Sequence, residues 1–101
     1  MRDEAKIVIN GKHWKIRLVS PKELPSDADG TCSYPPGRFP SLEVNKNLSE
    51  KMIMVTLIHE LLHASCEVLA EESVIAISEA VAKGMWAINY RRVCPKPRTQ
   101  R

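Results

Sequence analysis

The chain has 101 residues, of which 44% are hydrophobic and 27% charged, a composition typical of one globular domain with one modest core. No apolar run reaches the roughly 18 residues that a membrane span needs, and the N-terminus does not begin a signal peptide, so we expect a cytoplasmic protein without membrane contact. Residues 1–90, which we take as the domain, hold all 12 acids, whereas residues 91–101 form a basic tail with no acid. Most such tails are solvated chain ends, so nucleic acid is not the partner that we expect.

Residues 6–19 have the pattern of a β-hairpin. Asn10-Gly11 is the strongest two-residue turn signal, and it pairs Ile9 with Lys12 and Ile7 with Trp14. His13 then falls on the polar face, as a surface histidine.

Two shorter strands are expected further along the chain. Residues 20–30 indicate a loop with one helical turn at residues 21–24, and residues 31–34 and 41–45 predict strands on either side of a proline-rich turn. We expect one of these two strands at a sheet edge, with Leu42 and Val44 facing inward.

Two helices follow. Residues 49–70 predict the first helix, with Asn47 as its N-cap; its apolar residues lie nearly all round, which is typical of a buried central helix. Residues 72–90 predict the second, with an apolar stripe formed by Val74, Ile77, Val81, Met85 and Ile88. A short hinge near residues 69–73 would make the two helices antiparallel neighbours.

The first helix carries the motif H-E-x-x-H at residues 59–63. His59 and His63 lie about 6 Å apart on one helix face, a spacing that lets two imidazoles bind one zinc ion. Glu60 can then reach a water on the metal and act as a general base. The alternative is a pair of core histidines that flank a glutamate, but polar residues at these positions in so apolar a helix favour the metal site.

A catalytic zinc usually has a third protein ligand. Glu67 is about 12 Å from His59 along the axis, too far to converge, and the simplest role of Glu71 and Glu72 is to face the positive end of the second helix. Glu79 fits best, because a hairpin that turns near residues 70–71 places it level with residue 62. The alternative for Glu79 is a partly exposed glutamate.

The cysteines are odd in number and lack C-x-x-C spacing, so free thiols are expected at Cys32, Cys66 and Cys94. Cys66 shares the histidine face. It is either a ligand or, more commonly, a free thiol beside the site.

Four segments together resemble a known family: residues 41–45 (SLEVN), 47–50 (NLSE), 56–64 (TLIHELLHA) and 78–81 (SEAV). The chain resembles the minimal gluzincin-like zinc-metallopeptidase domains of phages and bacteria, which are related to the ImmA/IrrE and SprT-like groups. The resemblance covers about residues 30–90. It implies zinc held by His59, His63 and Glu79, with Glu60 as the base.

The sequence therefore predicts a small α+β zincin-like domain, with an N-terminal β-hairpin and short sheet followed by an antiparallel helix pair. We expect a zinc metallopeptidase that acts on a peptide or protein, with the strand ending at Val44 as a site of β-addition. Tyr90 and His13 are candidates for the oxyanion donor, though neither has distinctive spacing. The alternatives are a zinc-binding protein without turnover and a basic-tailed nucleic-acid-binding module.

Overall fold

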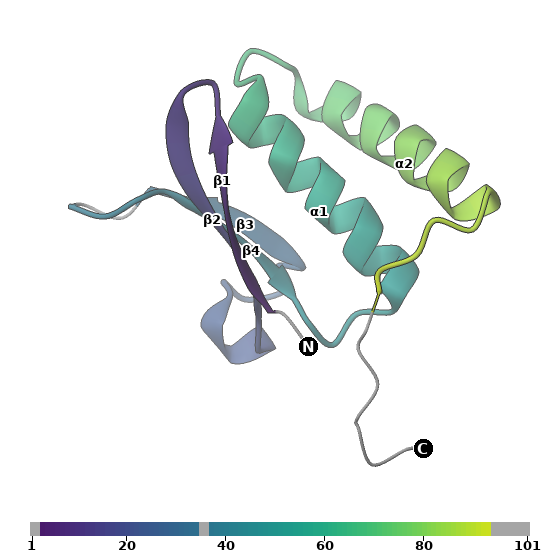
Figure 1. Ribbon diagram of the computed structural model, residues 1–101, viewed down its shortest axis with the longest axis horizontal. Coiled ribbons are helices and arrows are strands. Elements are labelled where there is room, and N and C mark those ends of the chain that lie inside the picture. Colours follow the sequence, from purple (N-terminus) through teal and green to yellow (C-terminus); the bar gives the residue numbers. More distant parts are fainter. Residues whose placement is uncertain (1–2, 35–36, 94–101) are drawn as a thin grey trace.

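The computed structural model describes residues 3–34 and 37–93 and arranges them in three layers (Figure 1). A four-stranded sheet packs against helix α1, and helix α2 lies on the side of α1 away from the sheet. The elements are β1 (Glu4–Ile9), β2 (Lys12–Val19), η1 (Pro21–Glu23), β3 (Gly30–Ser33), β4 (Ser41–Asn45), α1 (Glu50–Ser65) and α2 (Glu71–Ala87). The predicted α+β class, with a hairpin and short sheet before a helix pair, is confirmed.

The hairpin has the predicted register. Asn10 and Gly11 both have positive φ, 51° and 79°, which is the geometry of a type I′ turn. Ile7 therefore pairs with Trp14 and Ile9 with Lys12, and His13 is exposed. The inward face of the hairpin brings Trp14, 3% exposed, into the core.

The sheet order is β1-β2-β4-β3, with β2 and β4 parallel and the other pairs antiparallel. Strand β3 is an edge, as expected for one of the two short strands, and Leu42 and Val44 of β4 are fully buried. The expectation of β-addition at the strand ending at Val44 is wrong, because β2 and β3 already pair with both sides of β4.

Helix α1 begins and ends at residues that differ from the prediction. Ser49, not Asn47, is the N-cap, and its Oγ accepts a hydrogen bond from the Met52 amide at 3.2 Å. The helix ends at Ser65 rather than near residue 70. The Asn10 side-chain amide donates a 2.9 Å hydrogen bond to the Ser65 carbonyl, so the hairpin turn caps the C-terminus of α1.

Helix α2 contacts α1 through smaller residues than predicted. Its buried residues are Val74, Ser78 and Ala82. The predicted stripe is wrong at Ile77, Val81 and Ile88, which are 38%, 43% and 70% exposed. Small side chains at the contact let two helices approach closely, and this turns the larger residues toward solvent.

The predicted basic tail at residues 91–101 is described only to Val93, so Cys94 and the rest of the tail lie outside the described residues. Within residues 3–34 and 37–93, neither helix has the length and apolar character needed to cross a membrane.

Candidate metal centre

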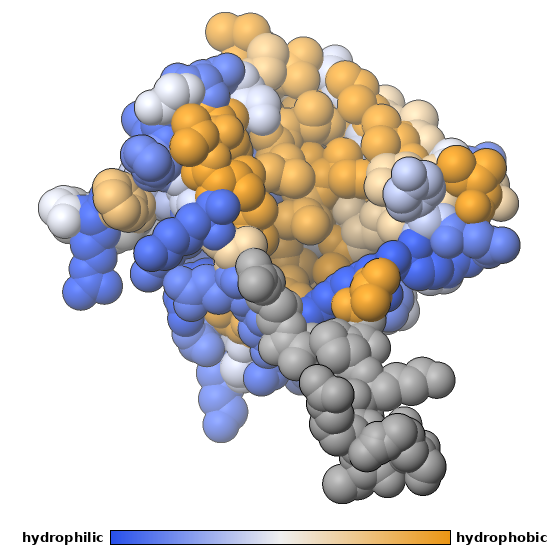
Figure 2. All heavy atoms as spheres, in the orientation of Figure 1, coloured by the Kyte–Doolittle hydropathy of each residue, from blue (hydrophilic) through white to orange (hydrophobic). Residues whose placement is uncertain are grey.

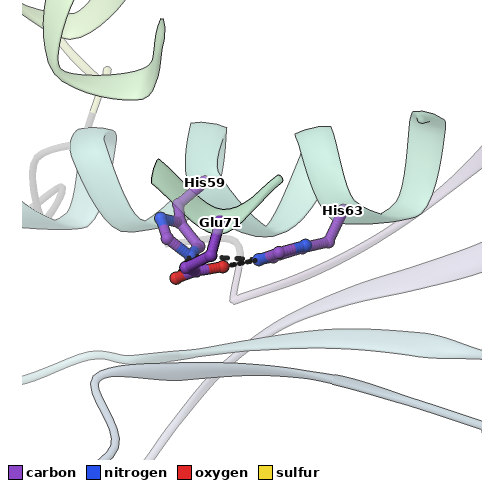
Figure 3. Close-up of side chains that lie close together, drawn as sticks. All are labelled: His59, His63 and Glu71. Carbon is purple, nitrogen blue, oxygen red and sulfur yellow. Dashed lines mark hydrogen bonds and ion pairs between the residues drawn. The ribbon is translucent and has the colours of Figure 1, made fainter. Parts of the chain in front are cut away.

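Three side chains from two helices converge at one point (Figure 3). His59 and His63 project from the same face of α1, and Glu71 reaches them from the first turn of α2. The Nε2 atoms of the two histidines are 3.2 Å apart. The Glu71 carboxylate lies 3.2 Å from Nε2 of His59 through Oε2 and 2.9 Å from Nε2 of His63 through Oε1.

These distances fit a tetrahedral metal ion. Ligand atoms about 2.1 Å from a tetrahedral zinc lie about 3.4 Å from one another. Here the two Nε2 atoms are 3.2 Å apart, and each lies 2.9 to 3.2 Å from a different oxygen of the Glu71 carboxylate, slightly closer than in that triangle. With one donor atom taken from each residue, all three atoms lie within 4.8 Å of one another. The donor set, two neutral imidazoles and a carboxylate, suits a divalent transition metal and leaves a fourth position open. The cluster could therefore hold a metal ion.

The same atoms also lie within bonding distance of one another. One imidazole can donate to the other across 3.2 Å, and a protonated histidine forms an ion pair with Glu71. The Glu71 side chain is 60% exposed, so such an ion pair is screened by solvent and contributes little to stability.

Glu71 occupies the position that the sequence assigned to Glu79. Glu79 is exposed and lies eight residues beyond Glu71, about 12 Å further along α2. The structure therefore does not bring Glu79 to the two histidines. The reason is the early end of α1: residues 66–70 form the connection, and α2 begins beside the histidines instead of beyond them.

Glu60 lies on the sheet side of α1, next to the cluster. The residue is 8% exposed, and its Cγ would lie 3.3 Å from a Cβ added at Gly30 of β3. Burial raises the pKa of the Glu60 carboxyl above its usual range; the positive charge that His59 and His63 can carry opposes this rise. A carboxylate with a raised pKa beside a metal centre is suited to accepting a proton.

The other candidates lie outside the cluster. Cys66 caps the C-terminus of α1 as a free thiol and is not among the grouped donors. Cys32 is also a free thiol, and burial raises its pKa, which disfavours the reactive thiolate. His13 stacks on Phe39 with ring centroids 5.7 Å apart, and Tyr90 lines a groove beside α1 and α2. His13 is not among the grouped metal donors.

Sequence reasoning missed Glu71 as a neighbour of the histidines. A signal was present, because Glu71 lies eight residues after His63, where a second helix could return it to the motif. To use this signal one must know where α1 ends, and at that end the Ser65 carbonyl accepts a hydrogen bond from the distant Asn10.

Comparison of the chain with protein-family models, curated proteins and solved structures finds no match. The function must therefore be argued from the site itself.

Proposed function

We propose that the protein is a zinc-dependent peptidase whose metal is held by His59, His63 and Glu71. The observation that carries the proposal is the convergence of two imidazole nitrogens, 3.2 Å apart, on one carboxylate, each within 3.2 Å of one of its oxygens, one residue away from a buried glutamate. Structural zinc sites need no such glutamate, and burying a carboxyl that has no function costs stability.

In this proposal the residues of the chain have separate tasks. Zinc, when bound, supplies a Lewis acid that polarises a peptide carbonyl and lowers the pKa of water. His59 and His63 bind through Nε2, and Glu71 adds the negative charge that partly neutralises the ion. Glu60 takes a proton from the attacking water and delivers it to the leaving amine. Its burial between α1 and β3 keeps bulk water from competing for that proton.

The edge strand β3 offers a place for an extended peptide. β3 pairs with β4 on one side only, so the backbone groups on its other side are available for β-addition. Gly30, the first residue of β3, lies against Glu60 and Thr56 of α1. A peptide added along β3 would therefore run beside the helix that carries the metal centre.

A zinc-binding protein without turnover is the second candidate. The observation in its favour is that the ligands come from both helices, so a metal ion here would tie α2 to α1. Either function suits a reducing compartment such as the cytoplasm, since Cys32 and Cys66 are free thiols.

The test measures zinc and hydrolysis separately. Native mass spectrometry of the purified protein should find one zinc, which His59→Ala and His63→Ala should each abolish. Cleavage of an unfolded-protein library should require zinc and fall at least ~10²-fold in Glu60→Gln, with the zinc retained. Zinc binding without any cleavage by the wild type would favour the second candidate, and a wild type that binds no zinc would refute both.

A further inference from the structure

An apolar groove runs along α1 on the side away from the metal centre. Its apolar walls are formed mainly by Met54, Leu57, Ile58 and Leu61 of α1 and by Met85 and Trp86 of α2, around a volume of 370 Å³; the charged residues Glu50, Arg91 and Arg92 also line it. Figure 2 shows this face as a broad hydrophobic surface between the β-hairpin and α2, with α1 as its floor. Contiguous apolar surfaces of this kind are typical of interaction sites.

The groove is separate from the proposed active site. Leu61 is two residues from His59, which places their side chains about 160° apart around α1. No residue of the groove belongs to the grouped metal donors. The sheet covers one side of α1 and α2 covers a second, so the groove is the remaining apolar side of a helix that is apolar nearly all round.

The walls of the groove determine what backbone can occupy it. Both α1 and α2 are helices, whose backbone amides and carbonyls bond within the helix. They leave no row of backbone groups with which an extended strand could pair. An occupant must satisfy its own backbone hydrogen bonds, and an amphipathic helix does so while presenting an apolar face.

The charge at one end of the groove determines the chemistry of the partner. Arg91 stacks on Trp86 at 3.4 Å from the ring centroid and donates to the carbonyls of Trp86 and Tyr90. Among the described residues, no ion pair joins Arg91 to a carboxylate. The charged residues among the described lining are Glu50, Arg91 and Arg92, and Arg92 pairs with Asp3 at 3.3 Å, so Arg91 is the position where an acidic side chain of a partner can pair.

Two occupants from the chain itself fit less well. Residues 94–101 (CPKPRTQR) contain no large apolar side chain with which to fill the groove. A second copy, docked about a two-fold axis through the groove, would bring Arg91 and Arg92 of both copies into one contact, where like charges repel.

We propose that the groove docks an amphipathic helix of a partner protein, with its apolar face against α1 and α2 and its acidic residues toward Arg91. The probe is a synthetic 18-residue helical peptide with leucine at i, i+3, i+4 and i+7 positions and glutamate as its charged residue. Matched peptides replace each glutamate by lysine, or each leucine by serine. Binding is measured by fluorescence anisotropy of a labelled peptide at two salt concentrations.

The 101-residue chain should bind the acidic peptide at least ~10-fold more tightly than the lysine peptide and should not bind the serine peptide. Met54→Asp should abolish binding, because it places a charge on the groove wall. Arg91→Glu should reduce the preference for the acidic peptide at least ~10-fold. Ile75→Asp and Arg38→Glu are matched controls at residues outside the groove, and they should bind like the wild type. Thermal unfolding of each variant establishes that it folds.

Absence of binding by the wild type, or equal binding of the acidic and lysine peptides, would overturn the proposal. A dimer in sedimentation experiments that Met54→Asp dissociates would assign the groove to a second copy instead. Because the peptide assay requires neither zinc nor hydrolysis, its outcome is independent of the proposed peptidase activity.

Discussion

Replacing Glu71 should show whether its carboxylate is a metal ligand or only a favourable charge at the start of α2. Structural zinc in four-ligand peptides is bound with about 10–16 kcal/mol, or roughly 3 kcal/mol per ligand. Removal of one of the three protein donors that converge here should then weaken zinc binding on the order of 10²-fold, at about 1.4 kcal/mol per tenfold. Glu71→Ala is the test, with zinc affinity measured against a competing chelator.

Two variants control for the other roles of a glutamate on α2. Glu72 shares the first turn of α2 with Glu71, so Glu72→Ala reproduces the loss of a favourable charge at the helix N-terminus without removing a donor. Glu79→Ala tests the ligand that the sequence favoured. Both should bind zinc within about threefold of the wild type, a difference below ~1 kcal/mol. Equal losses in Glu71→Ala and Glu72→Ala, or a greater loss in Glu79→Ala, would refute the assignment of Glu71.

Three further predictions concern the elements that hold the site. Gly30→Ala should lower the free energy of unfolding by about 1–3 kcal/mol in urea, since the added Cβ would lie 2.7 Å from the Thr56 Cγ2, and Thr56→Ser should recover part of this loss by removing that methyl group. Asn10→Gly keeps a residue that tolerates the positive φ of the turn but removes the hydrogen bond to the Ser65 carbonyl. The free energy of unfolding should therefore fall by about 1 kcal/mol, and zinc binding should weaken. Unchanged zinc affinity would contradict a role of this cap in placing α2. Burial raises the pKa of the Glu60 carboxyl, so the folded metal-free protein should hold that proton more tightly than the unfolded chain does. The free energy of unfolding should therefore fall as the pH rises above the usual glutamate range. In thermal unfolding with a chelator present, Glu60→Gln should lose less stability between pH 5 and pH 8 than the wild type.

Local patterns were sufficient to predict most of the fold. The Asn10-Gly11 turn determines the hairpin register through the positive φ of both residues, and the alternation in residues 41–45 places Leu42 and Val44 in the core. Both signals act over a few neighbouring residues, so tertiary contacts are not needed to interpret them. The two motif histidines share a face for the same reason, since helical geometry alone aligns residues four apart.

The third residue of the cluster follows from where α1 ends, which no local pattern marks. Residues 66–70 contain no glycine or proline that would stop the helix, and the sequence pattern continues to residue 70. The side chain that caps α1 comes from Asn10, 55 residues earlier in the chain. Helix α1 ends five residues earlier than predicted, which shortens it by about 7 Å. This shift is enough to place Glu71 instead of Glu79 beside the histidines.

The apolar character of α1 was predicted from the sequence, but the burial that we expected from it is only partly confirmed. A helix that is apolar nearly all round was expected to be a buried central helix. The sheet and α2 cover two sides, and Ser78 and Ala82 allow α2 to lie close to α1 while Ile77, Val81 and Ile88 remain exposed. The excess of apolar residues is therefore not explained by the packing of the described residues. It is explained if a further helix covers the groove, and the same helix α1 would then present a metal centre on one face and a docking surface on the other.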